Sequence, residues 1–140
     1  MITKTLIIGT GFLSDNLIKK ITKSKIFSAQ EFINEINLIN KSKEKYNLII
    51  NSFFPTKNIS SFGSYEIFTK KAVFEISKIL DLINQKKINK IIYTSSSSVN
   101  DIALNLNNTN KDNFNRELYS SFKLAVEKLI LNYANKKNKK

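Results

Sequence analysis

The sequence predicts an α/β fold with a three-layer, doubly wound parallel sheet of about four strands. Short apolar runs bounded by glycine or polar residues alternate with longer segments whose apolar residues recur every three or four positions, a pattern typical of strands and helices. Strand-helix-strand units of this length form right-handed parallel crossovers. We expect the sheet order 2-1-3-4, with a ligand site at the carboxyl end of the first strand, where the order reverses.

Four apolar runs predict the strands: residues 4–8 (KTLII), 25–28 (KIFS), 46–50 (YNLII) and 90–94 (KIIYT). Apolar residues at helical spacing predict the helices: 12–22, 29–45, 64–86 and 115–135. Pro55 is the only proline and closes the third strand, because proline cannot donate to a strand ladder. The remaining stretches are expected to be loops, at 56–63 and 100–113.

The length of 140 residues fits one hydrophobic core. We expect a single domain over residues 1–135 and a disordered basic tail over 136–140. Cysteine and histidine are absent, which excludes disulfides, thiol catalysis, serine-histidine triads and the usual zinc sites. No apolar stretch is long enough for a membrane span or a signal peptide. We therefore expect a cytoplasmic protein without a metal, whose chemistry depends on Ser, Thr, Tyr, Lys or carboxylates.

The net charge of +12 comes from 22 lysines and Arg116 against 11 acidic residues. Four of the lysines fall in the last five residues, and the others are scattered among Asn and Ile. Phosphate recognition usually favours arginine for its bidentate fork, and a charge run is most often a solvated surface. We therefore do not expect a nucleic-acid partner. An anchor for an anionic polymer in the basic tail is a weaker alternative.

Two of the three glycines stand between the first predicted strand and the first predicted helix. Glycine is needed where a diphosphate approaches peptide N–H groups at a sharp turn, and the helix that follows adds unpaired N–H donors. The pattern G-x-G-x-x-S predicts a dinucleotide site with these cofactor-binding residues: Gly9, Thr10, Gly11, Phe12, Leu13 and Ser14. The alternative is a tight turn with no ligand. Asp15 would repel a phosphate if it faced the same way.

Glu31 lies about 20 residues further on, where a ribose-binding acid is expected. The alternative is stronger: Ser28-Ala29-Gln30-Glu31 fits the S-x-x-E capping box that starts a helix. Lys23 and Lys25 are candidates to meet a 2′-phosphate, so the choice between NAD and NADP stays open.

Tyr119 and Lys123 form the pattern Y-x-x-x-K, which places both side chains on one face of a helix. The pattern alone is weak, since Tyr133 and Lys137 form a second copy; the first copy is distinguished by its place at the start of the last helix. A tyrosine is a poor base at neutral pH, but a nearby ammonium favours the phenolate. A serine such as Ser96 would then orient the substrate oxygen, although residues 95–98 also fit a polar turn at a strand end.

Together these residues resemble the short-chain dehydrogenase/reductase superfamily, in particular its extended branch, the NAD-dependent epimerases and dehydratases of nucleotide sugars. The matching segments occur in the family's order: TLIIGTGFLSDNL, YNLIINSFFP, KIIYTSSSSV and YSSFKLAVEKLI. The resemblance implies a Rossmann-like fold in which Tyr119 is the catalytic acid/base and Ser96 is the family's catalytic Ser/Thr. It implies that Lys123 is both catalytic and cofactor-binding, through the nicotinamide ribose, and that Ser52 adds a cofactor contact in the strand on the adenine side. It further implies NAD or NADP, a nucleotide-sugar substrate, and a homodimer formed through the two long helices.

The chain departs from the family pattern in three ways. Ile8 and Ser14 occupy two of the glycine positions of the commonest form, G-x-x-G-x-x-G. The short stretch between the first helix and YNLII predicts one strand fewer than usual. We also expect the chain to be truncated relative to the family, without its C-terminal substrate-binding part. The alternative function is therefore a catalytically inactive Rossmann-like nucleotide-binding or interaction module.

Overall fold

The computed structural model describes residues 3–51, 65–96, 99 and 111–138, with the side chains of 65, 111–118, 137 and 138 left undescribed. Ser52 and the predicted loop 56–63 lie outside the described residues, as do residues 100–110. Within the described part of the chain, no helix is long and apolar enough to cross a membrane.

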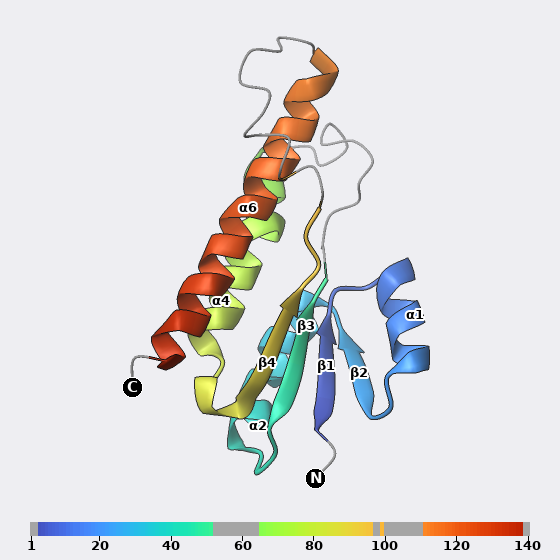
Figure 1. Ribbon diagram of the computed structural model, residues 1–140, viewed down its shortest axis with the longest axis vertical. Coiled ribbons are helices and arrows are strands. Elements are labelled where there is room, and N and C mark those ends of the chain that lie inside the picture. The colour runs from blue at the N-terminus through green and yellow to red at the C-terminus, as the bar shows by residue number, and fades with distance from the viewer. Residues whose placement is uncertain (1–2, 52–64, 97–98, 100–110, 139–140) are drawn as a thin grey trace.

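The structure has one four-stranded sheet whose strands are all parallel (Figure 1). The strands are β1 (Lys4–Ile8), β2 (Ser24–Phe27), β3 (Tyr46–Ile50) and β4 (Ile88–Tyr93). They lie in the order β2-β1-β3-β4, which confirms the predicted order. Since β1 pairs with β3 in direct register, Ile8 beside Ile50, the residues that follow these two strands meet at one edge of the sheet.

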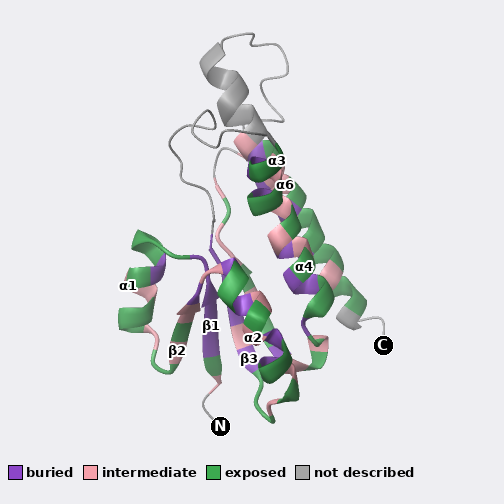
Figure 2. Ribbon diagram, turned by 180° about the vertical axis from the view of Figure 1, so that it is seen from behind, coloured by how far each residue is buried: buried purple, intermediate pink, exposed green. Residues whose placement is uncertain are grey.

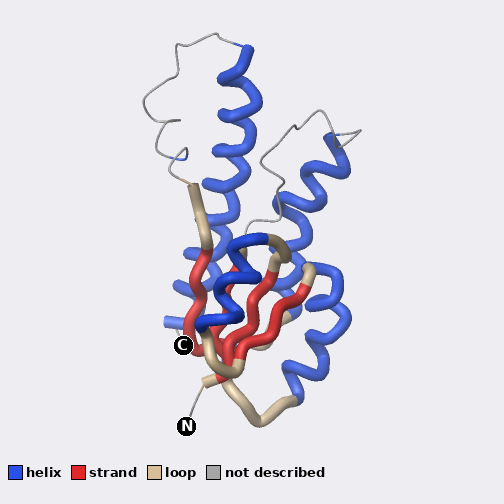
Figure 3. The backbone as a smooth tube through the Cα atoms, turned by 90° about the vertical axis from the view of Figure 1, so that its right-hand side faces the viewer, coloured by secondary structure: helices blue, strands red, loops and turns tan. Residues whose placement is uncertain are grey.

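Helices cover both faces of the sheet, so the three-layer α/β architecture is confirmed. The helix α1 (Phe12–Lys20) lies on one face, in front of the strands in Figure 3. The opposite face carries α2 (Ala29–Lys41), the long helix that begins as α3 (Tyr65–Thr69) and ends as α4 (Glu75–Leu82), and the C-terminal α6 (Lys111–Asn138). The arrangement is Rossmann-like.

The core lies between the sheet and the three longer helices (Figure 2). Strand side chains alternate between faces, so every second apolar residue of β1 and β3 points to this side. The members from the two strands and from α6 are Leu6, Ile8, Tyr46, Leu48, Ile50, Val126 and Ile130. Phe32 of α2 is fully buried here and packs edge-to-face on Phe27 with ring centroids 5.5 Å apart.

A π-helical turn at Lys70–Phe74 joins α3 to α4. In an α-helix, residues spaced four apart drift around the axis by about 40° per step. A π turn contains more residues per turn and takes up this drift. Phe68 and Ala72, before and inside the turn, therefore stay on the buried side with Ile76 and Leu80 of α4.

Several helix ends differ from those predicted. The helices expected to reach residues 22, 45 and 86 end at Lys20, Lys41 and Leu82. The ends of α2 and α4 are tied together, because the Asn40 side chain donates to the Leu82 carbonyl (2.9 Å) and accepts from the Asn84 N–H (2.8 Å). These bonds satisfy groups that a longer helix would satisfy itself.

The last helix is longer than predicted at both ends. It begins at Lys111, so residues 111–113 are helical and not part of a loop, and it continues to Asn138. Residues 136–138, expected in a disordered tail, are therefore helical. Lysines near a helix C-terminus are favoured by the helix dipole, which accounts for the extension into the basic segment.

Replacing Phe32 with alanine is expected to lower the free energy of unfolding by about 3 to 5 kcal/mol, because the change leaves a cavity where the ring packs on Phe27. Urea denaturation measures the loss. Leu38→Ala on the same helix is the control: its side chain is 69% exposed, and its effect should stay within about 0.5 kcal/mol. Equal losses in the two variants would contradict the placement of this core.

Candidate functional site

The turn after β1 needs its two glycines for different reasons. Gly9 and Gly11 have φ values of +113° and +115°, a region that side chains of L-residues rarely adopt. A Cβ at Gly9 would lie 3.1 Å from the Cβ of Asn51, so Gly9 also allows close packing of two strand ends. A Cβ at Gly11 would meet nothing within 4 Å, so open space lies in front of this residue.

That open space faces the start of α1. The first N–H groups of an α-helix have no partner within the helix, and Gly11, the N-cap, has no side chain to offer them an acceptor. Thr10, Phe12 and Leu13 are exposed around this point, Phe12 to 87%. A helix start of this kind suits an anion. Asp15, also exposed in the first turn, is the one acidic residue of α1.

Ser14, at the third glycine position, faces into the protein. It is fully buried, and its hydroxyl donates to the Gly9 carbonyl (2.6 Å) and accepts from the Asn51 side-chain amide (2.8 Å). The serine therefore braces the turn from inside, in a place where a glycine would leave the Gly9 carbonyl without this donor.

Asn51 and Thr94 extend this hydrogen bonding across the sheet. The Thr94 hydroxyl donates to the Asn51 side-chain oxygen (2.8 Å), and the Lys123 ammonium donates to the Thr94 carbonyl (2.7 Å). The chain Gly9–Ser14–Asn51–Thr94–Lys123, here called the polar relay, joins the ends of β1, β3 and β4 to α6. Asn51 and Thr94 are not among the site residues predicted from the sequence, although each is a polar residue at the end of an apolar strand, which is a signal for such a role.

Lys123 and Tyr119 lie together at this edge. Lys123 is only 1% exposed, and its ammonium lies 4.8 Å from the ring centroid of Tyr93 and 5.8 Å from that of Tyr119. Burial lowers the pKa of Lys123 to about 8, while the carboxylate of Glu127, one turn along α6, acts in the opposite direction. The lysine is thus a desolvated cation held by a carbonyl and two aromatic faces.

The second Y-x-x-x-K copy lies elsewhere. The Tyr133 hydroxyl donates to the Ile83 carbonyl (3.3 Å), beyond the end of α4, and burial raises the pKa of Tyr133 to about 12. Tyr133 therefore has a packing role at the opposite end of the sheet. Position in the fold separates the two copies, but Tyr119 does not stand at the start of the last helix as predicted, because α6 begins at Lys111.

Ser96 lies two residues beyond Thr94, on the segment that Lys123 holds. Its carbonyl accepts from the Val99 N–H (3.1 Å), and the residue is partly buried. Ser96 therefore belongs to the carboxyl edge that also carries Tyr119 and the Gly9–Gly11 turn.

Glu31 forms the capping box that its spacing predicted. Its carboxylate accepts from the Ser28 N–H (2.7 Å), which lowers the pKa of Glu31, and its own N–H donates to the Ser28 hydroxyl (3.3 Å). Of the two lysines considered for a 2′-phosphate, Lys23 precedes β2 at the opposite edge. The Lys25 ammonium pairs with Glu35 of α2 at 3.2 Å and lies 4.4 Å from the ring centroid of Phe27, the last residue of β2.

The free energy of unfolding is expected to rise by about 3 kcal/mol between pH 8 and pH 10.5 through Lys123. In this interval the unfolded chain still binds the lysine proton and the folded chain has released it, so a higher pH favours folding. Denaturation of the wild type and Lys123→Met across this range checks the effect. The difference between the two pH profiles gives the contribution of Lys123 alone, because both proteins contain the same buried tyrosines.

Lys128→Met, an exposed lysine on the same helix, is the matched control and should retain the rise. If Lys123→Met retains it as well, Lys123 is not the buried titrating group.

Comparisons of the chain with protein-family models, with curated proteins and with solved structures find no match. Inference about function therefore rests on the residues at the carboxyl edge of the sheet and on their geometry.

Proposed function

We propose that this chain is an NAD(P)-dependent oxidoreductase of the short-chain dehydrogenase/reductase type, similar to the epimerases and dehydratases that act on nucleotide sugars. The observation that carries the proposal is the pairing of Tyr119 with the buried Lys123, linked by the polar relay to a glycine turn at the switch point of a parallel sheet. In open α/β sheets, ligands bind outside the carboxyl ends of the strands at this point.

The residues at the turn fit a dinucleotide. The space in front of Gly11 is one that any side chain would fill, and it leads to the first N–H groups of α1, which suit a diphosphate. The exposed faces of Phe12 and Leu13 flank it, and Lys123 is the residue expected to approach the nicotinamide ribose. When bound, the nicotinamide supplies a hydride acceptor or donor.

Tyr119 is the group proposed to exchange a proton with a sugar hydroxyl. At neutral pH Lys123 is charged, since its pKa of about 8 lies above 7, and its ammonium lies 5.8 Å from the centroid of the Tyr119 ring. Because the lysine is almost fully buried, water screens this interaction weakly. Ser96 is proposed to orient the same substrate oxygen. Above pH 8 the lysine loses its charge, and its attraction for the tyrosine ring weakens.

The two tyrosines of the Y-x-x-x-K copies provide the test. Tyr119→Phe is expected to lower the rate of NAD(P)H formation from a panel of nucleotide hexoses by about 100-fold or more, because the proton-transfer group is removed. Tyr133→Phe, in the same helix but bound to Ile83, should keep the wild-type rate. The rate is followed by absorbance of the reduced nicotinamide.

Binding is measured separately by fluorescence titration with NADH and NADPH. The wild type should bind one or both with saturation, and Gly11→Val should weaken binding at least tenfold, since its side chain fills the space before α1. Absence of saturable binding of both NADH and NADPH by the folded wild type would contradict the proposal.

A catalytically inactive nucleotide-binding module is the second candidate. It is favoured by the Lys123 ammonium, which is already bound to the Thr94 carbonyl and stacked on Tyr93. Saturable NADH binding with no turnover in either the wild type or Tyr119→Phe would select this candidate.

A homodimer is proposed through the two long helices. They carry exposed apolar side chains: Ile67, Phe74, Leu82, Leu129 and Leu131. Covering such side chains lowers the free energy of the pair. Light scattering at micromolar concentration should give the mass of two chains, and Phe74→Lys with Leu131→Lys should give the mass of one. Leu38→Lys, on α2, should leave the dimer intact, and a monomeric wild type would contradict the proposal.

A further inference from the structure

The fold gathers lysines that are scattered in the sequence. In a parallel α/β sheet, every strand begins and every covering helix ends at the same edge, here the lower edge in Figure 1. The lysines in the connections at this edge, here called the basic edge, are Lys23, Lys41, Lys43, Lys45, Lys86 and Lys87. All are exposed except Lys87, which is half-buried.

Specific hydrogen bonds hold two of these connections together. The Lys87 ammonium donates to the Ser42 carbonyl, and Asn40 binds both Leu82 and Asn84. The lysines that follow α2 therefore lie beside those that precede β4. A partner that contacts this edge therefore meets lysines whose backbone is held in place by these hydrogen bonds.

Carboxylates do little to neutralise this row. Glu44 lies within it, but its carboxylate is already paired with Lys4 at 2.8 Å. Lys23 also lies near enough to contribute to the lowered pKa of Glu44, after the larger effect of Lys4. Asp81, in the last turn of α4, is the other acidic residue of the described chain near this edge.

The opposite edge has the reverse charge pattern. Acidic residues occupy the first turns of α1, α2 and α3: Asp15, Glu31 and Glu66. Helix dipoles favour this distribution, with acids at helix starts and lysines at helix ends. The positive field is therefore concentrated away from the proposed dinucleotide site.

We infer that the basic edge binds the phosphate backbone of duplex nucleic acid without reading its sequence. This reverses the expectation drawn from the scatter of the lysines in the sequence, because the fold brings six of them to one edge. Lysine binds phosphate as a point charge, whereas base reading relies on the arginine fork, and the basic edge has no arginine among its described residues. Four strands about 4.8 Å apart make an edge of about 14 Å, and a duplex carries about eight phosphate charges over that length when both strands are counted.

The side chains between the lysines favour a duplex over other anionic partners. Single strands are held by stacking bases on exposed aromatic rings, but Tyr46, at the start of β3, is buried with its hydroxyl on Ser42 (2.9 Å). Protein interfaces centre on clustered apolar or aromatic anchors. Leu82 is exposed at this edge, but its neighbours Asn40 and Asn84 are polar.

Fluorescence anisotropy with a labelled duplex of about 20 base pairs, over roughly 50 to 200 mM salt, tests the inference. Contacts from about five lysines predict a slope of log K against log salt near −4.5. The triple variant Lys43→Gln, Lys45→Gln and Lys86→Gln should reduce the steepness by about 3 and weaken binding at low salt at least tenfold, while NADH binding stays unchanged.

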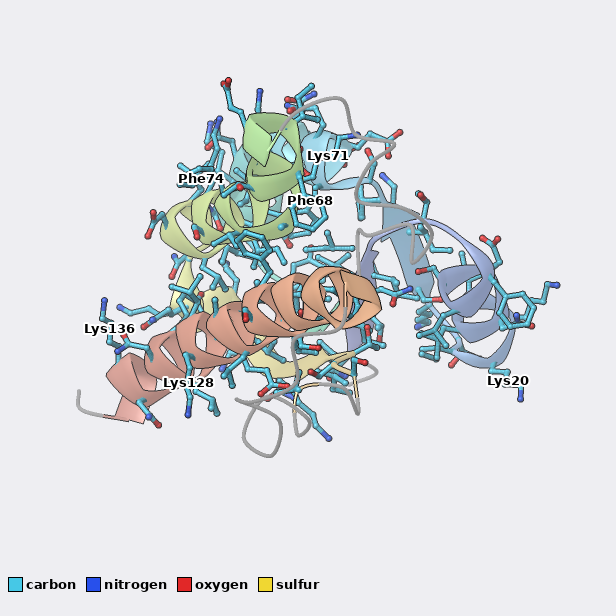
Figure 4. All side chains as sticks on the ribbon, turned by 90° about the horizontal axis from the view of Figure 1, so that it is seen from above. Lys20, Phe68, Lys71, Phe74, Lys128 and Lys136 are labelled. Carbon is cyan, nitrogen blue, oxygen red and sulfur yellow. The ribbon has the colours of Figure 1, made fainter. Side chains whose placement is uncertain are left out.

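The matched control removes the same charge elsewhere. Lys70→Gln, Lys71→Gln and Lys128→Gln change exposed lysines on the long helices, two of which are labelled in Figure 4, and should leave the slope unchanged. Equal losses in both triple variants would mean that net charge alone attracts the duplex and would overturn the inference. Tighter binding to polyglutamate or to a single strand than to the duplex would also overturn it.

Discussion

The side-chain amide of Asn51 is the contact on which the candidate site depends. Its nitrogen donates to Ser14, which braces the glycine turn, and its oxygen accepts from Thr94, whose carbonyl holds Lys123. Together with the backbone bonds from Asn51 to Ile8 and from Thr94 to Ile50, these side-chain bonds fix three strand ends and α6 relative to one another. Because a buried amide that lost either partner would carry the cost of an unpaired polar group, the two halves of the site are stabilised together.

The environment of Lys123 shows why the fixed geometry of the strand ends and α6 matters for the candidate site. Moving an ammonium out of water is unfavourable, and here it is offset by a carbonyl at 2.7 Å and by the faces of Tyr93 and Tyr119. The nearby tyrosine hydroxyl of Tyr93 is itself desolvated, and burial raises its pKa. A cation kept dry beside two phenols interacts more strongly with them than it would in water, which is the property that a proton-transfer site requires.

The parts that could be predicted from the sequence are those governed by local pattern. Strands β1 and β3 begin and end where their apolar runs do, and the Ser28–Glu31 capping box follows from a three-residue spacing. The parts that could not be predicted depend on residues far apart in the chain. The Asn40–Asn84 bonds set two helix ends, and the Asn51–Thr94 bond builds the site. Neither pairing produces a periodic pattern in the sequence, because each joins residues that come close only when the strands are aligned in the sheet.

The π-helical turn at Lys70–Phe74 has a consequence for how the long helix tolerates changes in length. The turn sets the rotation of α3 relative to α4, so that the ring centroids of Phe68 and Phe122 of α6 lie 5.2 Å apart while Ile79 is buried in the core. Deleting one residue here would restore regular α-helical winding and rotate the first turns by roughly a quarter of a revolution. Phe68 would then lose its contact with α6. The contact between α3 and α6 would be lost, while α4 would keep its packing against the sheet.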